Sequence, residues 1–291
     1  MFQGFERARA TLSATDIAYV VGGTGAPVLL LHGYPQTHVA WAEVAPLLAE
    51  RLTVVVPDLR GYGDSGAPPP DPDHFAYSKR AMGQDMAQLM TGLGFAQFAI
   101  GGHDRGGRVA FRMALDYRDR VTKLATLDIV PTLDKTEAID GDLAFESYHW
   151  FFLAQPAPLP ETLINHDPDF YLRHTVRSWS GTSDELDPHA MSEYLRCFRK
   201  SSVVRAACED YRAGLTIDLE HDREDRAAGR RIECPVLVLH QRGKAEGGLD
   251  ELLDWWRRWA DDVRGQVLNA GHFLMEEAPQ ETADALLDFF V

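Results

Sequence analysis

The sequence predicts an α/β protein whose eight-stranded, mostly parallel β-sheet is flanked by helices and interrupted by an inserted helical cap. Three observations lead to this fold class. Short strand-like apolar segments recur along the 291 residues, helical segments separate them from the third onward, and one long stretch carries helical patterns only. Strands that alternate with helices are typical of a parallel sheet covered on both faces.

The strand-like and helical segments follow one another in a regular order. Eight strands are predicted, at 9–13, 17–21, 28–32, 53–57, 98–102, 123–129, 235–240 and 265–269. Apolar residues spaced at i, i+3 and i+4 predict helices between or after them. These helical segments are 40–50, 77–93, 108–117, 249–260 and 281–290.

A cap is predicted at residues 138–213, where strand patterns disappear and aromatic helical segments take their place. Those segments are 145–155, 168–179, 191–199 and 201–214. We therefore expect a core made of residues 1–137 and 214–291, with the cap inserted between these two parts.

Composition limits the classes of partner. The formal net charge of −15 disfavours nucleic acid and anionic membranes, and the longest apolar runs are far too short to span a bilayer. The N-terminal residues carry both charge signs and lack the apolar core of a signal peptide, so we expect a cytoplasmic protein. Three cysteines without CxxC spacing predict reduced, structural thiols: Cys197, Cys208 and Cys234.

The segment 101–114, GGHDRGGRVAFRMA, has the pattern of a nucleophile elbow with Asp104 where a serine usually stands. A carboxylate nucleophile needs a base and an acid that orients the base. His272 follows the final strand, and Asp128 ends the strand 123–129. A strand-end aspartate can also simply cap a turn, but the order nucleophile, acid, base predicts a triad of Asp104, Asp128 and His272.

The segment LHGYPQTHVAW after the third strand predicts half of an oxyanion hole. The backbone N–H of Tyr34 would be one donor and that of Arg105 the other. His32 and Gly33 would then set the backbone conformation of this loop. We expect His38 at the surface.

Two arginines occupy the first turn of the elbow helix. A helix N-terminus repels cations, so Arg105 and Arg108 predict an anion between them, and the guanidinium fork suits a carboxylate. The competing interpretation is a structural pairing with Asp58 or Asp64. Arg112, one turn further along, is expected to form an i,i+4 pair with Asp116.

Taken together, these motifs resemble those of the aspartate-nucleophile branch of the α/β-hydrolase superfamily, and most closely those of the fluoroacetate (haloacetate) dehalogenases. The resemblance covers nearly the whole chain. Its stretches are LHGYPQ, PDLRGYGDS, GGHDRGGRVA, LDIVPT, YHWFFLAQP, CEDYRAG and GHFLMEEAP.

The resemblance implies a role for each matching residue. Asp104 would attack the halogen-bearing carbon, Arg105 and Arg108 would hold the substrate carboxylate, and His149, Trp150 and Tyr211 would bind the departing halide. The alternative for these three aromatic side chains is packing inside the cap. Haloalkane dehalogenases and many epoxide hydrolases typically carry Trp directly after the nucleophile, where this chain has Arg105.

The sequence thus predicts a hydrolase without metal or other cofactor that converts a short 2-haloacid, haloacetate first, to the 2-hydroxyacid and halide. The expected partners are the anionic substrate and water, and the resemblance suggests a homodimer. Two alternatives stay open. One is an epoxide hydrolase that uses Tyr148 or Tyr211 as its acid, and the other is a catalytically silent protein that binds a small carboxylate.

Overall fold

One eight-stranded sheet organises the chain in the computed structural model, which describes residues 1–181, 186–242 and 248–291. The spatial order is β1-β2-β4-β3-β5-β6-β7-β8. The strands are β1 (Glu6–Thr11), β2 (Asp16–Gly22), β3 (Ala26–Leu31), β4 (Leu52–Pro57), β5 (Phe98–His103), β6 (Val121–Leu127), β7 (Val236–Gln241) and β8 (Val263–Leu268). Every predicted strand is confirmed, with ends shifted by a few residues.

Strand direction brings the loops that follow the parallel strands to one edge of the sheet, which we call the functional edge. β2 pairs antiparallel with β1 and β4, whereas the pairs from β4 through β3, β5, β6 and β7 to β8 are parallel. The carboxyl ends of these parallel strands therefore meet at the same edge, where ligands bind in open α/β sheets. The central strand β5 is buried along its whole length because helices cover both faces.

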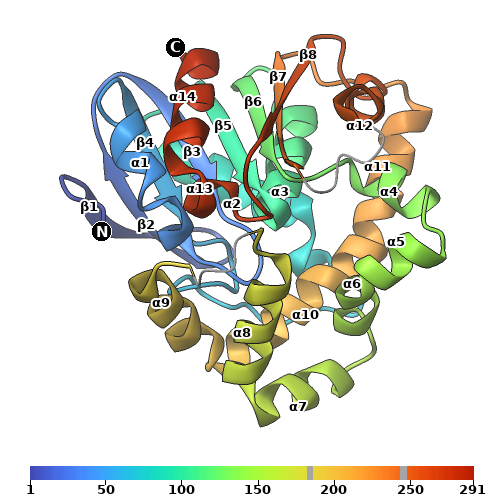
Figure 1. The fold of residues 1–291 in the computed structure, drawn as a ribbon. Coiled ribbons are helices and arrows are strands. Elements are labelled where there is room, and N and C mark those ends of the chain that lie inside the picture. Colours follow the sequence, from blue (N-terminus) through green and yellow to red (C-terminus); the bar gives the residue numbers. More distant parts are fainter. Residues whose placement is uncertain (182–185, 243–247) are drawn as a thin grey trace.

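Helices cover the sheet on both sides (Figure 1). α1 and α14 pack against each other on one face, and α2 and α3 pack against each other on the opposite face. α3 follows β5 directly and therefore begins at the functional edge. The bounds are α1 (Val44–Leu48), α2 (Lys79–Gly92), α3 (Asp104–Asp116), α12 (Gly248–Arg257), α13 (Leu274–Glu277) and α14 (Pro279–Phe290).

Only helices are named among the described residues between β6 and β7, and Figure 1 shows most of them gathered at one end of the sheet. They are α4 (Thr132–Glu137), α5 (Gly141–Glu146), α6 (Tyr148–Leu153), α7 (Leu159–His166), α8 (Pro168–Trp179), α9 (Pro188–Phe198), α10 (Ser201–Leu215) and α11 (Ile217–Ala227). Residues 182–185 of the predicted cap and 243–247 of the predicted second core part lie outside the described residues. The boundaries at 138 and 213 stay predictions.

Four of these helices, α4, α5, α7 and α11, have no separate counterpart among the segments predicted from apolar spacing. α4, α5 and α7 have eight residues or fewer, so their periodicity is too brief to stand out. No described helix is long and apolar enough to cross a membrane.

Candidate active site

The elbow between β5 and α3 holds Asp104 in a strained turn. Asp104 has a φ of 44°, in the left-handed region that non-glycine residues rarely adopt. Flanking glycines make the tight packing possible. A Cβ on Gly102 would lie 2.5 Å from the Gly106 carbonyl oxygen, and one on Gly106 would lie 2.3 Å from the His32 carbonyl oxygen. The turn thus presents the Asp104 carboxylate at the functional edge of the sheet.

The Asp104 carboxylate is buried and held by a backbone amide. The N–H of Tyr34 donates to Asp104 Oδ2 over 2.9 Å, as expected for a donor on the loop after β3. Burial favours the protonated acid, but His272, His103 and the nearby arginines outweigh it and hold the pKa of Asp104 below its usual value. Asp104 is therefore ionised at neutral pH.

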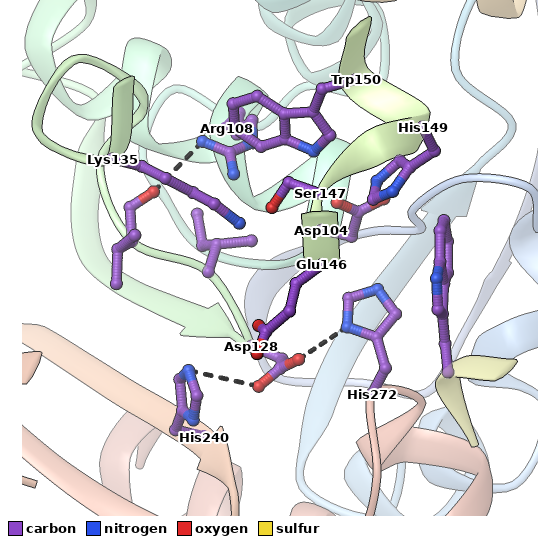
Figure 2. Close-up of a pocket in the computed structure, with 13 residues that line it drawn as sticks. Asp104, Arg108, Asp128, Lys135, Glu146, Ser147, His149, Trp150, His240 and His272 are labelled. Carbon is purple, nitrogen blue, oxygen red and sulfur yellow. Dashed lines mark hydrogen bonds and ion pairs between the residues drawn. The ribbon is translucent and has the colours of Figure 1, made fainter. Parts of the chain in front are cut away.

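His272 and Asp128 form a close pair beside Asp104. His272 Nδ1 lies 2.6 Å from Asp128 Oδ2, and Figure 2 shows Asp128 between His272 and His240. Gln241 donates to the same carboxylate through its backbone N–H, at 3.1 Å, and through its side chain, at 2.6 Å. Although burial opposes ionisation, His240 and His272 hold the pKa of Asp128 far below its usual range. Asp128 is therefore an ionised carboxylate, and its contact with Nδ1 can hold the His272 ring in place.

The two arginines of the elbow helix have different surroundings. Arg105 is 1% exposed and forms a bidentate pair with Asp210 of α10, at 3.0 Å through Nε and 2.7 Å through one terminal nitrogen. That terminal nitrogen also donates to the Asp210 backbone carbonyl at 2.7 Å. Its partner is therefore neither Asp58 nor Asp64, the pairings considered from sequence.

Arg108 is 4% exposed, and no described carboxylate forms an ion pair with it. One terminal nitrogen donates to the Val130 carbonyl at 3.1 Å and to the Thr132 hydroxyl at 2.6 Å, while its Nε has no partner among the described residues. Burial and the neighbouring Arg105 lower the pKa of Arg108 to about 10. A buried cation with no carboxylate at ion-pair distance is incompletely stabilised, so this position favours a further anion.

A cavity of about 100 Å³ joins Asp104, Arg108 and His272. Figure 2 shows these side chains converging with others from the cap helices and from β7. The full lining consists of Asp104, Arg108, Asp128, Ile129, Val130, Lys135, Glu146, Ser147, His149, Trp150, Trp179, His240 and His272. No cluster of His, Cys, Asp or Glu suited to a metal ion occurs among the described residues.

The three side chains expected to bind halide lie near one another but not equally near the cavity. His149 and Trp150 line it, whereas Tyr211 does not. The Tyr211 ring centroid lies 5.8 Å from that of His149, and its buried hydroxyl has no hydrogen-bond partner among the described residues. The Arg108 guanidinium carbon lies 4.5 Å from the Trp150 ring centroid.

Several site residues were not identified from sequence. The Trp179 ring lies against the His149 ring, with centroids 4.5 Å apart and planes tilted by 53°, and His240 Nε2 lies 3.4 Å from Asp128 Oδ1. His240 lies near the carboxyl end of β7, a position that could have drawn attention to it. Asp210 directly precedes Tyr211 in a stretch that carried the family resemblance, and it could have been found there.

Of two further expectations, the one for His38 is wrong, whereas the pair of Arg112 with Asp116 is confirmed but is not the main contact of Arg112. His38, expected at the surface, is buried, with Nδ1 2.8 Å from Asp58 Oδ1. Arg112 does contact Asp116 at 3.4 Å, but its closest partners are carboxylates of α11, with Asp222 at 2.6 Å and Asp225 closer still. Neither partner could be inferred from local spacing.

Comparison with known proteins confirms the resemblance seen in the motifs. A fluoroacetate dehalogenase of Burkholderia sp. is 45% identical over 290 residues, which cover 99% of this chain and 95% of the relative. A soluble epoxide hydrolase of Corynebacterium sp. (strain C12) is 35% identical over 289 residues, which cover 97% of this chain and 96% of the relative.

The solved structure of an α/β hydrolase from Nostoc sp. PCC 7120 superposes with a TM-score of 0.96 at 51% identity and covers 99% of each chain. The sequence model of the alpha/beta hydrolase fold family matches residues 26–279. The chain, with its elbow aspartate and its helical insertion after β6, therefore belongs to the α/β-hydrolase fold family.

Proposed function

We propose that the protein is a hydrolytic dehalogenase that converts a short 2-haloacid, haloacetate first, to the 2-hydroxyacid and halide. The observation that carries this proposal is Arg108, a buried guanidinium without a carboxylate partner among the described residues, in the same small cavity as the ionised Asp104. A substrate carboxylate would supply the direct ion-pair partner that Arg108 lacks among the described residues. Arg105, already matched by Asp210, would add hydrogen bonds from its remaining N–H groups.

The first step is displacement at the α-carbon. Because Tyr34 N–H holds Asp104 Oδ2, the other oxygen, Oδ1, attacks the carbon as the carbon–halogen bond breaks. The halide leaves with the bonding pair, and an aspartyl ester remains. No proton moves in this step, so it needs no base.

The second step is hydrolysis of the ester. His272, oriented through Nδ1 by Asp128, removes a proton from water as the water oxygen attacks the Asp104 carbonyl carbon. The negative charge that develops falls on Oδ2, where the Tyr34 and Arg105 amides would stabilise it. Collapse breaks the bond between the carbonyl carbon and Oδ1, and the leaving oxygen takes the proton from His272, which gives glycolate when haloacetate is the substrate. Ionisation of the restored Asp104 carboxyl then releases one proton per turnover.

His149, Trp150 and Tyr211 would stabilise the departing halide through N–H and O–H donors. In a site without water, positioned hydrogen-bond donors stabilise the charge on a departing halide more than the same donors would in water. The unpartnered hydroxyl of Tyr211 and the cavity-lining positions of His149 and Trp150 support this role.

The size of the site supports a small substrate. A volume of about 100 Å³ is well below the roughly 300–1,000 Å³ that is usual for drug-sized ligands. The similarity to an epoxide hydrolase makes epoxide opening the second candidate, with Tyr148 or Tyr211 as acid. Tyr148 is 46% exposed and does not line the cavity, so Tyr211 is the better candidate for that acid.

We also propose that the enzyme is cytoplasmic and homodimeric. The three cysteines, all free, support the first because disulfides are rare in the cytosol, and resemblance to the dehalogenases supports the second. Large apolar side chains on the cap helices are exposed and would suit a subunit interface: Phe145, Leu159, Leu163 and Phe170. Light scattering after size exclusion measures the oligomeric state directly.

A halide-release panel tests the proposed reaction. The substrates are fluoro-, chloro- and bromoacetate, 2-chloropropionate, chloroacetamide, and styrene oxide followed as diol. We expect turnover of haloacetates and at least about a hundredfold lower efficiency on the neutral amide, because a buried charge left unpaired costs roughly 3 kcal/mol or more. Efficient styrene oxide opening would instead establish an epoxide hydrolase, and no turnover of any substrate would favour a binding protein.

A further inference from the structure

The loop that carries His272 has no regular secondary structure, although the proposed mechanism requires its imidazole to be placed accurately. The loop connects β8 to α13 and comprises residues 269–273. Asp128 fixes the ring through Nδ1, but a ring contact alone does not hold a backbone. Loops are the mobile parts of a fold unless other groups tie them down.

Glu277, at the end of α13, holds this loop on both sides of the histidine. Its Oε2 accepts a hydrogen bond from the N–H of Gly271 at 3.0 Å, and its Oε1 accepts one from the N–H of Phe273 at 3.1 Å. The two residues that flank His272 are thus bound by a single carboxylate. Hydrogen bonds to an ionised acceptor are stronger than those between neutral groups.

The same carboxylate reaches the cap. Oε2 of Glu277 also accepts from the N–H of Gly181, just beyond α8, at 2.8 Å. The backbones of Gly181 and Gly271 touch so closely that a Cβ on Gly271 would lie 1.9 Å from the Gly181 nitrogen. Glycine at both positions therefore permits a direct contact between the cap and the histidine loop.

His272 itself is bound at both backbone groups. Its N–H donates to the Trp179 carbonyl at 3.0 Å, and its carbonyl lies 2.8 Å from Nε2 of the buried His103. The Trp179 ring packs against the His272 ring with centroids 5.4 Å apart. The cap therefore contacts the histidine through backbone and side chain alike, and Glu277 connects both sides of this contact.

We propose that Glu277 is a positioning residue that holds the base His272 and ties it to the cap segment Trp179–Gly181. The proposal rests on the proposed function, because it assigns Glu277 to the second half-reaction. Ester hydrolysis needs the base, whereas halide displacement by Asp104 does not. Loss of the carboxylate should therefore slow hydrolysis selectively and leave displacement nearly unchanged.

The test separates the two half-reactions in Glu277→Gln, which keeps the side-chain volume. Rapid-quench measurement of chloride release from chloroacetate gives displacement, and intact-mass spectrometry gives the ester on Asp104. We expect displacement within about twofold of wild type, hydrolysis slowed roughly tenfold or more, and accumulated ester, since small misplacements of a reacting group are costly. Glu281→Gln, an exposed glutamate of α14, serves as matched control and should match wild type.

Other outcomes overturn the proposal. Equal slowing of both steps, or a lowered unfolding temperature with the two rates unchanged, would give Glu277 a merely structural role. If Glu277→Gln does not fold, Gly181→Ala replaces it: its Cβ would lie 2.5 Å from the Gly271 nitrogen, and it should show the same selective slowing. His272→Asn is run alongside, because failure of that variant to accumulate ester contradicts the two-step mechanism rather than the role of Glu277.

Discussion

Replacing Arg108 tests the feature on which the choice of substrate rests. The guanidinium is 4% exposed, has no carboxylate partner among the described residues, and lines the cavity that holds Asp104. Removing one partner of a buried ion pair costs about 3–5 kcal/mol. Arg108→Met should therefore lower kcat/KM for chloroacetate by roughly two to nearly four orders of magnitude.

Arg108→Lys keeps the charge but cannot reproduce the fork, because one guanidinium nitrogen already donates to Val130 and Thr132, and a lysine has a single nitrogen for these partners and a substrate. Loss of one charge-assisted hydrogen bond, about 1.5–3 kcal/mol, predicts a loss of kcat/KM of roughly ten- to a hundredfold.

Initial rates of chloride release give kcat and KM, and calorimetric titration with glycolate measures carboxylate binding separately. Arg118→Lys, just beyond the same helix and partly exposed in a pair with Glu233, is the matched control. Retention of nearly full activity by both Arg108 variants would refute the assignment of the carboxylate to this residue.

Three further predictions concern the base, the halide site and a buried acid. His272→Asn should accumulate a carboxymethyl ester on Asp104 after exposure to chloroacetate, and intact-mass spectrometry detects it; absence of both the ester and a chloride burst would exclude the two-step route. Trp150→Phe should slow turnover of fluoroacetate more than that of bromoacetate, because fluoride depends most on hydrogen bonding, and equal losses would return Trp150 to a packing role. Burial raises the pKa of Glu276 from 4.5 to about 8, so the folded protein binds this proton more tightly than the unfolded chain does. The stability that this proton contributes is complete below about pH 4.5 and is lost as the pH rises through about 8. The Tm of the wild type should therefore fall over that interval, and the Tm of Glu276→Gln should fall less. Parallel profiles of Tm against pH for the two proteins would contradict this prediction.

The main features of the fold follow from local patterns that are visible in the chain. Strand and helix signals alternate because a parallel sheet needs crossover helices, and every predicted strand forms. The elbow could be identified because its glycines and Asp104 are neighbours in sequence. The close contact of Asp128 with His272 was predictable because both follow strands whose carboxyl ends meet at one edge of a parallel sheet.

The partners of the charged side chains were decided only by tertiary packing. Arg105 and Arg108 look equivalent in sequence, yet α10 brings Asp210 to the first, whereas no described carboxylate pairs with the second. His38 is buried because Asp58, on the loop after β4, lies against it. Such partners are far apart in the chain, so no spacing rule connects them. The sequence alone determined which chemical groups the protein carries to the edge of its sheet, and the packing of the cap decided which cation remains for a substrate, because a buried charge is satisfied by whichever counterion the fold brings within reach.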